Sequence, residues 1–246
     1  MKAIFLSDVH LRDGLSVKTK IVIRFLEEVA SRFERIYLLG DLFDVWPGTN
    51  AYLVRTFRPV VSTLRRLVEN GHKVHYVEGN HDFRMGEYFT DSLGIAVHPD
   101  GVEHELGGRR VFLSHGDMGN PRDYAYRALR YVLRQDLLHV ALRAVPQDWV
   151  YRLGSRTSHA SRRYQGRVPR NEAAVRNIYR KTAESLFQSG YDVVIMGHTH
   201  LPDETRQRTN GRMCQYINTG DWVKHFTYLE FDGSDFYTKV HPVRAL

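Results

Sequence analysis

Short apolar runs recur along the chain, and each predicts a buried strand. Five of these runs are followed within two residues by Gly or Ser and then by Asp, Asn or His. They cover residues 2–6, 36–39, 73–77, 109–113 and 192–196. Open α/β sheets place their ligand sites at the carboxyl ends of strands. The pattern therefore predicts one site that is shared by several strand ends.

Segments with helical periodicity lie between the first predicted strands. Apolar residues at helical spacing predict a helix over 17–32, and further helices are expected at 51–69 and 86–93. This strand–helix–strand rhythm indicates parallel strands joined by crossovers. The later apolar runs at 214–217, 225–231 and 236–240 are typical of antiparallel strands. We expect an α/β (α+β) chain that forms a single domain over residues 1–246.

Residues 119–181 have a different character. Apolar residues keep helical spacing over 124–145, and a further helix is expected from about 169 to Gly190. The segment holds 13 Arg and one Lys against four acidic residues, a net charge of +10, whereas the whole chain carries +7. We interpret it as an Arg-rich helical insertion that meets an anionic partner. A solvated helix face is the simpler alternative.

Composition restricts the compartment. A single cysteine, Cys214, excludes an intrachain disulfide and suits a reducing environment. The first apolar run is too short for a signal peptide, and no run approaches the roughly 20 residues of a membrane span. We therefore expect a cytoplasmic protein, with peripheral membrane contact left open.

The polar residues at the strand ends are metal-ligand types. Asp8 and His10 flank Val9, so an extended backbone would point both side chains the same way. His198 and His200 repeat this spacing. Each motif alone is more often an ordinary turn or loop, but five in succession predict a cluster. The expected ligands are Asp8, His10, Asp41, Asn80, His115, His198 and His200.

This ligand set contains no cysteine, which suits two borderline divalent cations such as manganese, iron or zinc. Seven ligands for two ions require one shared group, and the two oxygens of Asp41 make it the best choice. His81 could reach the same centre, and Asp82 could fix the tautomer of its ring. We expect the other histidines to be core or surface residues: His72, His75, His98, His104, His139, His159, His225 and His241.

The whole set resembles the calcineurin-like metallophosphoesterase superfamily, whose pattern runs D-x-H, G-D-x-x-D, G-N-H-D/E, a single His, and G-H-x-H. The match spans residues 8 to 200. The resemblance implies two packed β-sheets flanked by helices. It also implies that Asp8, His10, Asp41 and His200 hold one metal, and that Asp41, Asn80, His115 and His198 hold the other. His81 would stabilise the departing or a non-bridging oxygen, which makes His81 and Asp82 the expected catalytic residues.

Within the superfamily the chain looks like the UDP-2,3-diacylglucosamine pyrophosphohydrolases of lipid A synthesis. The residues behind this are 40–46, 79–83, 115–117 and 197–202, together with the helical insertion, which caps the site and holds acyl chains in that family. Well-known members carry Arg where this chain has His81. The insertion also lacks their Ser/Thr/Asn/Lys string and offers as substrate contacts Arg163, Arg167, Arg170 and Asn171.

The resemblance implies hydrolysis of UDP-2,3-diacylglucosamine to UMP and 2,3-diacylglucosamine 1-phosphate, with two metal ions, most simply Mn²⁺. The Arg-rich insertion favours peripheral attachment to the anionic inner membrane, and no dedicated protein partner is inferred. One alternative is a phosphodiesterase or nuclease, which the Arg excess favours. Apolar helical stripes among those Arg residues argue against a nucleic-acid groove. Another alternative is a non-catalytic scaffold, which would be expected to have lost ligands.

Overall fold

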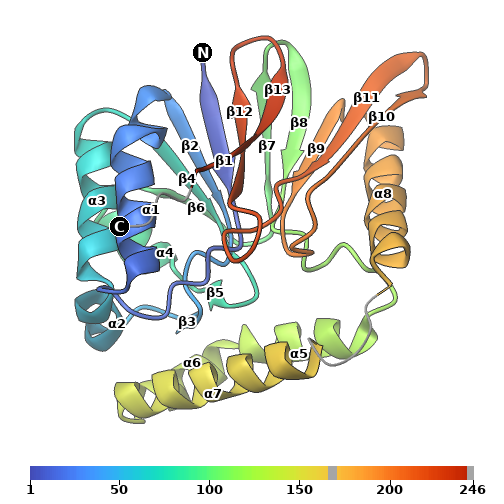
Figure 1. Cartoon of the computed structure of the whole chain (residues 1–246). Coiled ribbons are helices and arrows are strands. Elements are labelled where there is room, and N and C mark those ends of the chain that lie inside the picture. Colours follow the sequence, from blue (N-terminus) through green and yellow to red (C-terminus); the bar gives the residue numbers. More distant parts are fainter. Residues whose placement is uncertain (166–170, 243–246) are drawn as a thin grey trace.

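Two β-sheets pack face to face in the computed structural model, which describes residues 1–165 and 171–242. The first sheet has the order β13-β12-β1-β2-β4-β6 and the second β10-β11-β9-β8-β7 (Figure 1). The strands of the first are β1 (Ala3–Leu6), β2 (Arg35–Leu39), β4 (Lys73–Val77), β6 (Ala96–His98), β12 (Thr227–Phe231) and β13 (Phe236–Val240). Those of the second are β7 (Val102–Leu106), β8 (Arg109–Leu113), β9 (Val193–Met196), β10 (Asp203–Thr209) and β11 (Arg212–Asn218).

Strand direction brings the ligand motifs together. β1, β2, β4 and β6 pair in parallel in the first sheet, and β8, β9 and β11 do so in the second. Antiparallel strands flank both parallel groups. A small parallel pair, β3 (Trp46–Pro47) and β5 (Asp82–Phe83), lies beyond the ends of β2 and β4. The two-sheet architecture expected from the sequence is confirmed.

Helices cover the outer faces of both sheets. Helices α1 and α3 lie on the first sheet and α8 on the second (Figure 1). The elements are α1 (Val17–Glu28), η1 (Ala30–Arg32), α2 (Ala51–Thr56), α3 (Arg58–Glu69), α4 (Gly86–Asp91) and α8 (Glu172–Gln188). The helix expected over 51–69 is two helices, since α3 restarts after Phe57 with proline in its first turn.

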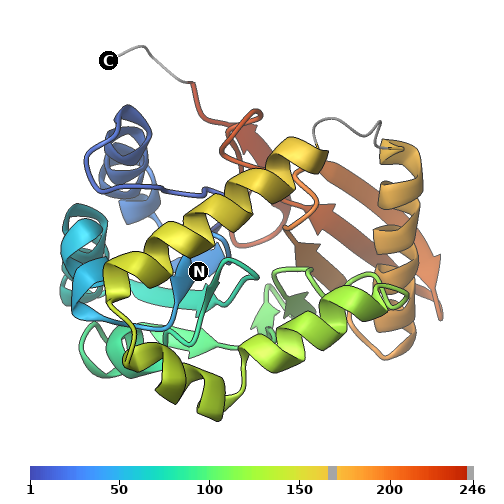
Figure 2. The same ribbon diagram turned by 90° about the horizontal axis from the view of Figure 1, so that it is seen from below.

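A separate layer crosses the strand ends. It consists of α5 (Tyr124–Leu133), α6 (Asp136–Arg143) and α7 (Gln147–Gln165), which we call the cap (Figures 1 and 2). The segment expected to form the insertion, 119–181, also includes the first part of α8, which packs on the second sheet. Among the helices of the described residues, none combines the length and the hydropathy that a membrane span requires.

Three apolar cores hold these layers together. The inter-sheet core contains alternate residues of the strands, among them Phe5, Tyr37 and Ile195, all fully buried. The other two cores lie between the first sheet and its helices and between the second sheet and α8. Successive strand residues point to opposite faces, so each central strand supplies two cores at once. This double burial explains the continuous apolar runs of the sequence.

Candidate metal centre

Five strand ends from both sheets meet beneath the cap. Asp8 and His10 follow β1, Asp41 follows β2, and Asn80 follows β4 in the first sheet. The second sheet contributes the remaining three side chains, His115 after β8 and His198 and His200 after β9. The structure thus brings together all seven residues that the sequence predicts as ligands.

The backbone of these loops is strained in a consistent way. Asp8, His10, Asp41, His198 and His200 all have positive φ angles, between 52° and 65°. This left-handed region is uncommon for residues other than glycine and costs roughly 1–3 kcal/mol at each site. Five such residues among seven indicate that the fold holds the side chains in place for a function.

Asp41 lies at the middle of the cluster. Its Oδ2 atom is 3.7 Å from His10 Nε2 and 3.5 Å from His115 Nε2. Its Oδ1 atom accepts a hydrogen bond from the amide of His81 at 2.9 Å. A side chain on Gly79 would collide with Asp41 Oδ1, so only glycine permits this approach. One carboxylate oxygen therefore faces both halves of the cluster.

One half of the cluster consists of Asn80, His115 and His198. Asn80 Oδ1 lies 3.0 Å from His115 Nε2 and 2.9 Å from His198 Nδ1. The Nδ1 atom of His115 donates to the carbonyl of Leu39 at 2.8 Å, which leaves Nε2 free to bind a cation. Burial lowers the pKa of His198 to about 3, so its ring is neutral, as ligation requires.

The other half consists of Asp8, His10 and His200. The Nε2 atoms of His10 and His200 are 3.3 Å apart, and His200 Nε2 is 3.5 Å from Asp8 Oδ1. Asp8 Oδ2 accepts from Ser7 Oγ at 2.5 Å and from the amide of His198 at 2.8 Å. Asp8 Oδ1 is buried and has no hydrogen-bond partner among the described residues. A buried carboxylate oxygen without a partner is costly, and a cation at this position would satisfy it.

A supporting residue comes from a loop after β11. Asp221 Oδ2 is 3.2 Å from His200 Nδ1, while its Oδ1 accepts from the amides of Val223, Lys224 and His225. Burial would raise the pKa of Asp221, but the hydrogen bonds from His200 and these amides hold it well below its usual value. The sequence suggests that the loop at 218–222 could return to the site, but it gives Asp221 itself no role. Its signal was the Gly220-Asp221 pair after a strand, which repeats Gly40-Asp41.

His81 faces the cluster, but Asp82 does not hold its ring. His81 Nε2 is 4.0 Å from Asp41 Oδ2, and its Nδ1 lies 2.9 Å from the carbonyl of Asp44. The carboxylate of Asp82 instead accepts from the amides of Asp41, Phe43 and Gly79 and from the hydroxyl of Tyr76. The prediction that Asp82 fixes the His81 tautomer was wrong, because Asp82 is fully occupied in shaping the loops.

The predicted substrate contacts are less well defined. The backbone of Arg163 belongs to α7, but its side chain is not among the described parts of the structure. Arg167 and Arg170 lie outside the described residues altogether. Asn171 is exposed, and its Oδ1 accepts from the amide of Ala174 at the start of α8. Asn171 therefore has a capping role in this structure, and its contact with substrate stays a prediction.

The donor set fits a pair of divalent cations. Aspartate and histidine side chains form three groups here, and within each group the ligand atoms lie within 4.8 Å of one another. The groups are Asp8–His10–His200, His10–Asp44–His81 and Asp8–Asp41–His115. These groups share members, so they form one continuous centre. Imidazole and carboxylate without thiolate suit manganese, iron or zinc. Two such cations could be held with Asp41 between them.

Comparison with known proteins agrees with this geometry. Residues 1–202 match the calcineurin-like phosphoesterase family. The chain is 31% identical to a UDP-2,3-diacylglucosamine hydrolase of Azotobacter vinelandii, covering 99% of this chain and 100% of that protein. It is 32% identical to the protein of the same name from Pseudomonas aeruginosa PAO1, covering 95% and 96%. A Stenotrophomonas maltophilia K279a protein of that name is 30% identical, covering 94% and 95%. The chain therefore belongs to the calcineurin-like phosphoesterase family of metal-dependent enzymes.

Proposed function

We propose that this enzyme hydrolyses the diphosphate of UDP-2,3-diacylglucosamine to UMP and 2,3-diacylglucosamine 1-phosphate, a step of lipid A synthesis. The observation that carries the proposal is an apolar cap surface over a phosphoesterase centre. Such a pair matches a substrate with an anionic diphosphate and a greasy acyl end. The three relatives described above are each named UDP-2,3-diacylglucosamine hydrolase, which supports the same substrate.

The apolar character of the cap is marked. Sixteen large hydrophobic side chains are exposed in the described part of the chain, and nine of them lie in or between α5, α6 and α7. They are Tyr124, Leu129, Tyr131, Val132, Leu137, Val140, Val145, Trp149 and Leu153. A hollow of about 510 Å³ between α6 and α7 is lined by Leu142, Val145, Trp149, Val150 and Leu153, with Arg152 and Arg156 beside them. We infer that acyl chains occupy this apolar surface.

Ion pairs fasten the cap over the strand ends. Arg130 Nε lies 2.9 Å from Asp117 Oδ2, two residues after His115, and the Tyr126 hydroxyl donates to the same oxygen at 2.5 Å. Arg134 Nη1 lies 2.8 Å from Glu78 Oε2, next to the Gly79-Asn80 loop. These two Arg residues are therefore used to position the cap, which reduces the basic surface left for a phosphate backbone.

We assign one cation to Asp8, His10, Asp41 and His200, and the other to Asp41, Asn80, His115 and His198. Mn²⁺ is the proposed metal, with iron or zinc as alternatives. When bound, two such cations supply Lewis acidity and an activated nucleophile for phosphoryl transfer. The chain itself contributes the ligands, which strained loops and neighbouring hydrogen bonds hold in fixed positions. These fixed ligands determine the position of the phosphate group.

His81 is placed to act on the phosphate directly. Its Nδ1–H donates to the carbonyl of Asp44, so a neutral ring presents only a lone pair at Nε2. Donation from Nε2 to a phosphoryl oxygen thus requires the doubly protonated ring, and the carboxylate of Asp41 lies 4.0 Å from this atom. We propose that His81 stabilises negative charge on the departing or a non-bridging oxygen, with Asp82 positioning the loops around it.

We further propose that the enzyme works in the cytoplasm at the surface of the inner membrane. The net charge of +10 over residues 119–181 would attract anionic headgroups, and Arg163, Arg167, Arg170 and Asn171 are the proposed contacts to substrate. Binding to anionic vesicles that weakens with added salt would support this attachment. Salt-insensitive or absent binding would contradict it.

A matched pair of surface substitutions tests the substrate. Leu153 in the cap and Val240 at the end of β13 are 66% and 65% exposed, so Leu153→Glu and Val240→Glu make similar changes in different places. We expect Leu153→Glu to lower turnover of the diacyl substrate at least tenfold while leaving bis-p-nitrophenyl phosphate hydrolysis unchanged. Val240→Glu should affect neither substrate.

The competing function is a phosphodiesterase or nuclease acting on nucleotides. Product analysis with the diacyl nucleotide sugar, its deacylated form, a cyclic dinucleotide and single-stranded DNA would separate the two. Preference for the deacylated sugar, the cyclic dinucleotide or DNA over the diacyl substrate would overturn the lipid assignment.

A further inference from the structure

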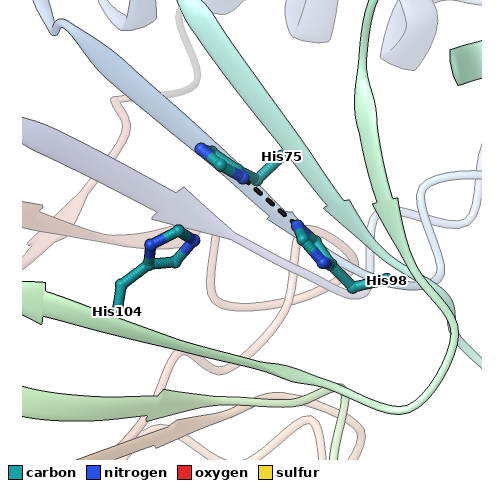
Figure 3. A group of neighbouring side chains, drawn as sticks. All are labelled: His75, His98 and His104. Atoms are coloured by element: carbon teal, nitrogen blue, oxygen red, sulfur yellow. Dashed lines mark hydrogen bonds between the residues drawn. The ribbon is translucent and has the colours of Figure 1, made fainter.

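Three histidines gather away from the metal centre, at the open edge of the β-sandwich. His75 lies on β4, His98 at the end of β6, and His104 on β7. β6 and β7 are the edge strands of the two sheets, and residues 99–101 connect them. Figure 3 shows the rings of His75 and His98 side by side, with the ring of His104 reaching towards them from the other sheet. The inter-sheet core thus ends in imidazoles at this edge.

The nitrogen atoms of the three rings converge. His75 Nδ1 and His98 Nε2 are 3.2 Å apart, and one nitrogen from each of the three rings lies within 4.8 Å of the others. A zinc ion with Zn–N bonds of about 2.0–2.1 Å places its tetrahedral ligands roughly 3.4 Å apart. The His75–His98 pair already has this spacing. The nitrogen of His104 that lies within 4.8 Å of both would supply the third ligand.

The contacts within the cluster leave one polar atom unsatisfied. His104 Nε2 is buried and has no hydrogen-bond partner among the described residues. The ring of His104 contacts the ring of His75 edge to face, with centroids 4.7 Å apart. Tyr37 stacks on the ring of His75, with centroids 4.8 Å apart. Stacking accounts for the position of His75, but it does not account for a buried imidazole nitrogen without a partner.

The rings are in the form that binds metals. Burial, the neighbouring rings and the charges of Arg35 and Lys73 lower the pKa of His75 to about 3. Burial also lowers the pKa of His98 and of His104. Neutral imidazoles offer lone pairs near pH 7, which a cation can accept without first displacing protons.

We propose that His75, His98 and His104 form a second metal site, separate from the catalytic centre, for one zinc ion or a similar divalent cation that prefers imidazole. Three protein ligands leave the fourth position to water. The ion would join β4 and β6 of one sheet to β7 of the other, and so crosslink the two sheets at this edge. Arg35 and Lys73 oppose a cation here, and no carboxylate belongs to the cluster. The site should therefore fill after the catalytic centre, which contains Asp8 and Asp41.

Metal counting on the whole protein tests the proposal. Metal-free enzyme is dialysed against excess Zn²⁺, and bound zinc is measured by mass spectrometry for wild type, His104→Phe and His72→Phe. His72 is a matched control because it lies outside both clusters and hydrogen-bonds the carbonyl of Phe33. We expect three zinc equivalents for wild type and His72→Phe but two for His104→Phe. Both variants should keep the wild-type Mn²⁺-dependent activity.

A measurement on the wild-type chain alone covers the case in which His104→Phe does not fold. Imidazole nitrogen signals of ¹⁵N-labelled protein are followed during a Zn²⁺ titration. The signals of His75, His98 and His104 should shift with the third equivalent, and the midpoint of thermal unfolding should rise with them. Two equivalents in all three proteins, or unchanged signals from these rings at saturation, would overturn the site and leave a stacked, hydrogen-bonded cluster.

Discussion

Asp221→Asn should weaken one cation site without damaging the fold. Asp221 Oδ2 accepts from His200 Nδ1, so His200 keeps its lone pair on Nε2, the atom 3.5 Å from Asp8 Oδ1. Asparagine can keep its single oxygen for the amides of Val223, Lys224 and His225, but its NH₂ group then faces His200 Nδ1. Two donors cannot pair. The ring is driven to the other tautomer, with a proton on the atom that must bind the cation.

The size of this effect follows from similar supporting residues. Loss of such a partner typically lowers metal affinity 10–100-fold, or roughly 1.4–2.8 kcal/mol. We expect the Mn²⁺ concentration for half-maximal hydrolysis of bis-p-nitrophenyl phosphate to rise by that factor. Asp221→Ala should also lose stability, because it removes the acceptor of three amides.

A suitable control is Asp232→Asn. Asp232 Oδ1 also accepts from two backbone amides, those of Ser234 and Asp235, but it lies in the turn between β12 and β13 and has no histidine partner in the described part of the chain. This variant should be activated at the wild-type Mn²⁺ concentration. If folded Asp221→Asn is also activated at that concentration, the tautomer of His200 is not set by Asp221 and the reasoning fails.

Three further predictions concern the two histidine clusters. Asp41→Ala should lose activity and lower the occupancy of both cations, whereas His10→Ala should mainly lower one; metal analysis showing two full equivalents in Asp41→Ala would contradict the shared position. His81→Ala should keep its metals and slow turnover of the diacyl substrate about 10²–10⁴-fold, so unchanged kinetics would make His81 a bystander. In the presence of a chelator, His75 should contribute a fall in the free energy of unfolding as pH drops from 6.5 towards 3, because its lowered pKa in the folded chain means that the unfolded chain binds the proton more tightly. The contribution of His75 to the slope of unfolding free energy against pH is at most about 1.4 kcal/mol per pH unit, and partial exposure of the ring reduces it. Urea titrations at several pH values should show a flatter slope in His75→Phe than in the wild type.

The sequence predicted the buried strands well because burial on both faces produces continuous apolar runs. The strands expected at 73–77, 109–113 and 236–240 coincide with β4, β8 and β13. β10 (Asp203–Thr209) was missed, since it is a polar edge strand in which half-buried and exposed residues alternate. β7 was missed for a related reason, because Glu103 and Glu105 interrupt its apolar residues.

The same contrast applies to the site. The seven expected ligands could be identified because each directly follows a recognisable strand. Asp221 and the carbonyl of Asp44 could not, since their roles depend on how distant loops pack against His200 and His81. The net charge of residues 119–181 also overstates their free basic surface. Arg130 and Arg134 are paired with Asp117 and Glu78, and these contacts join the cap to parts of the chain that lie outside that segment.

The position of β1 affects the order of events during synthesis. β1 pairs in parallel with β2 on one side and antiparallel with β12 on the other, so Ala3 lies opposite Phe231. β12 is synthesised long after β1, so β1 waits for it before its second edge is covered. His198 and His200 must likewise emerge before they can meet Asp8 and His10. Cations cannot guide the early steps of folding of this chain, and we expect the nascent protein to acquire them only after both sheets have closed.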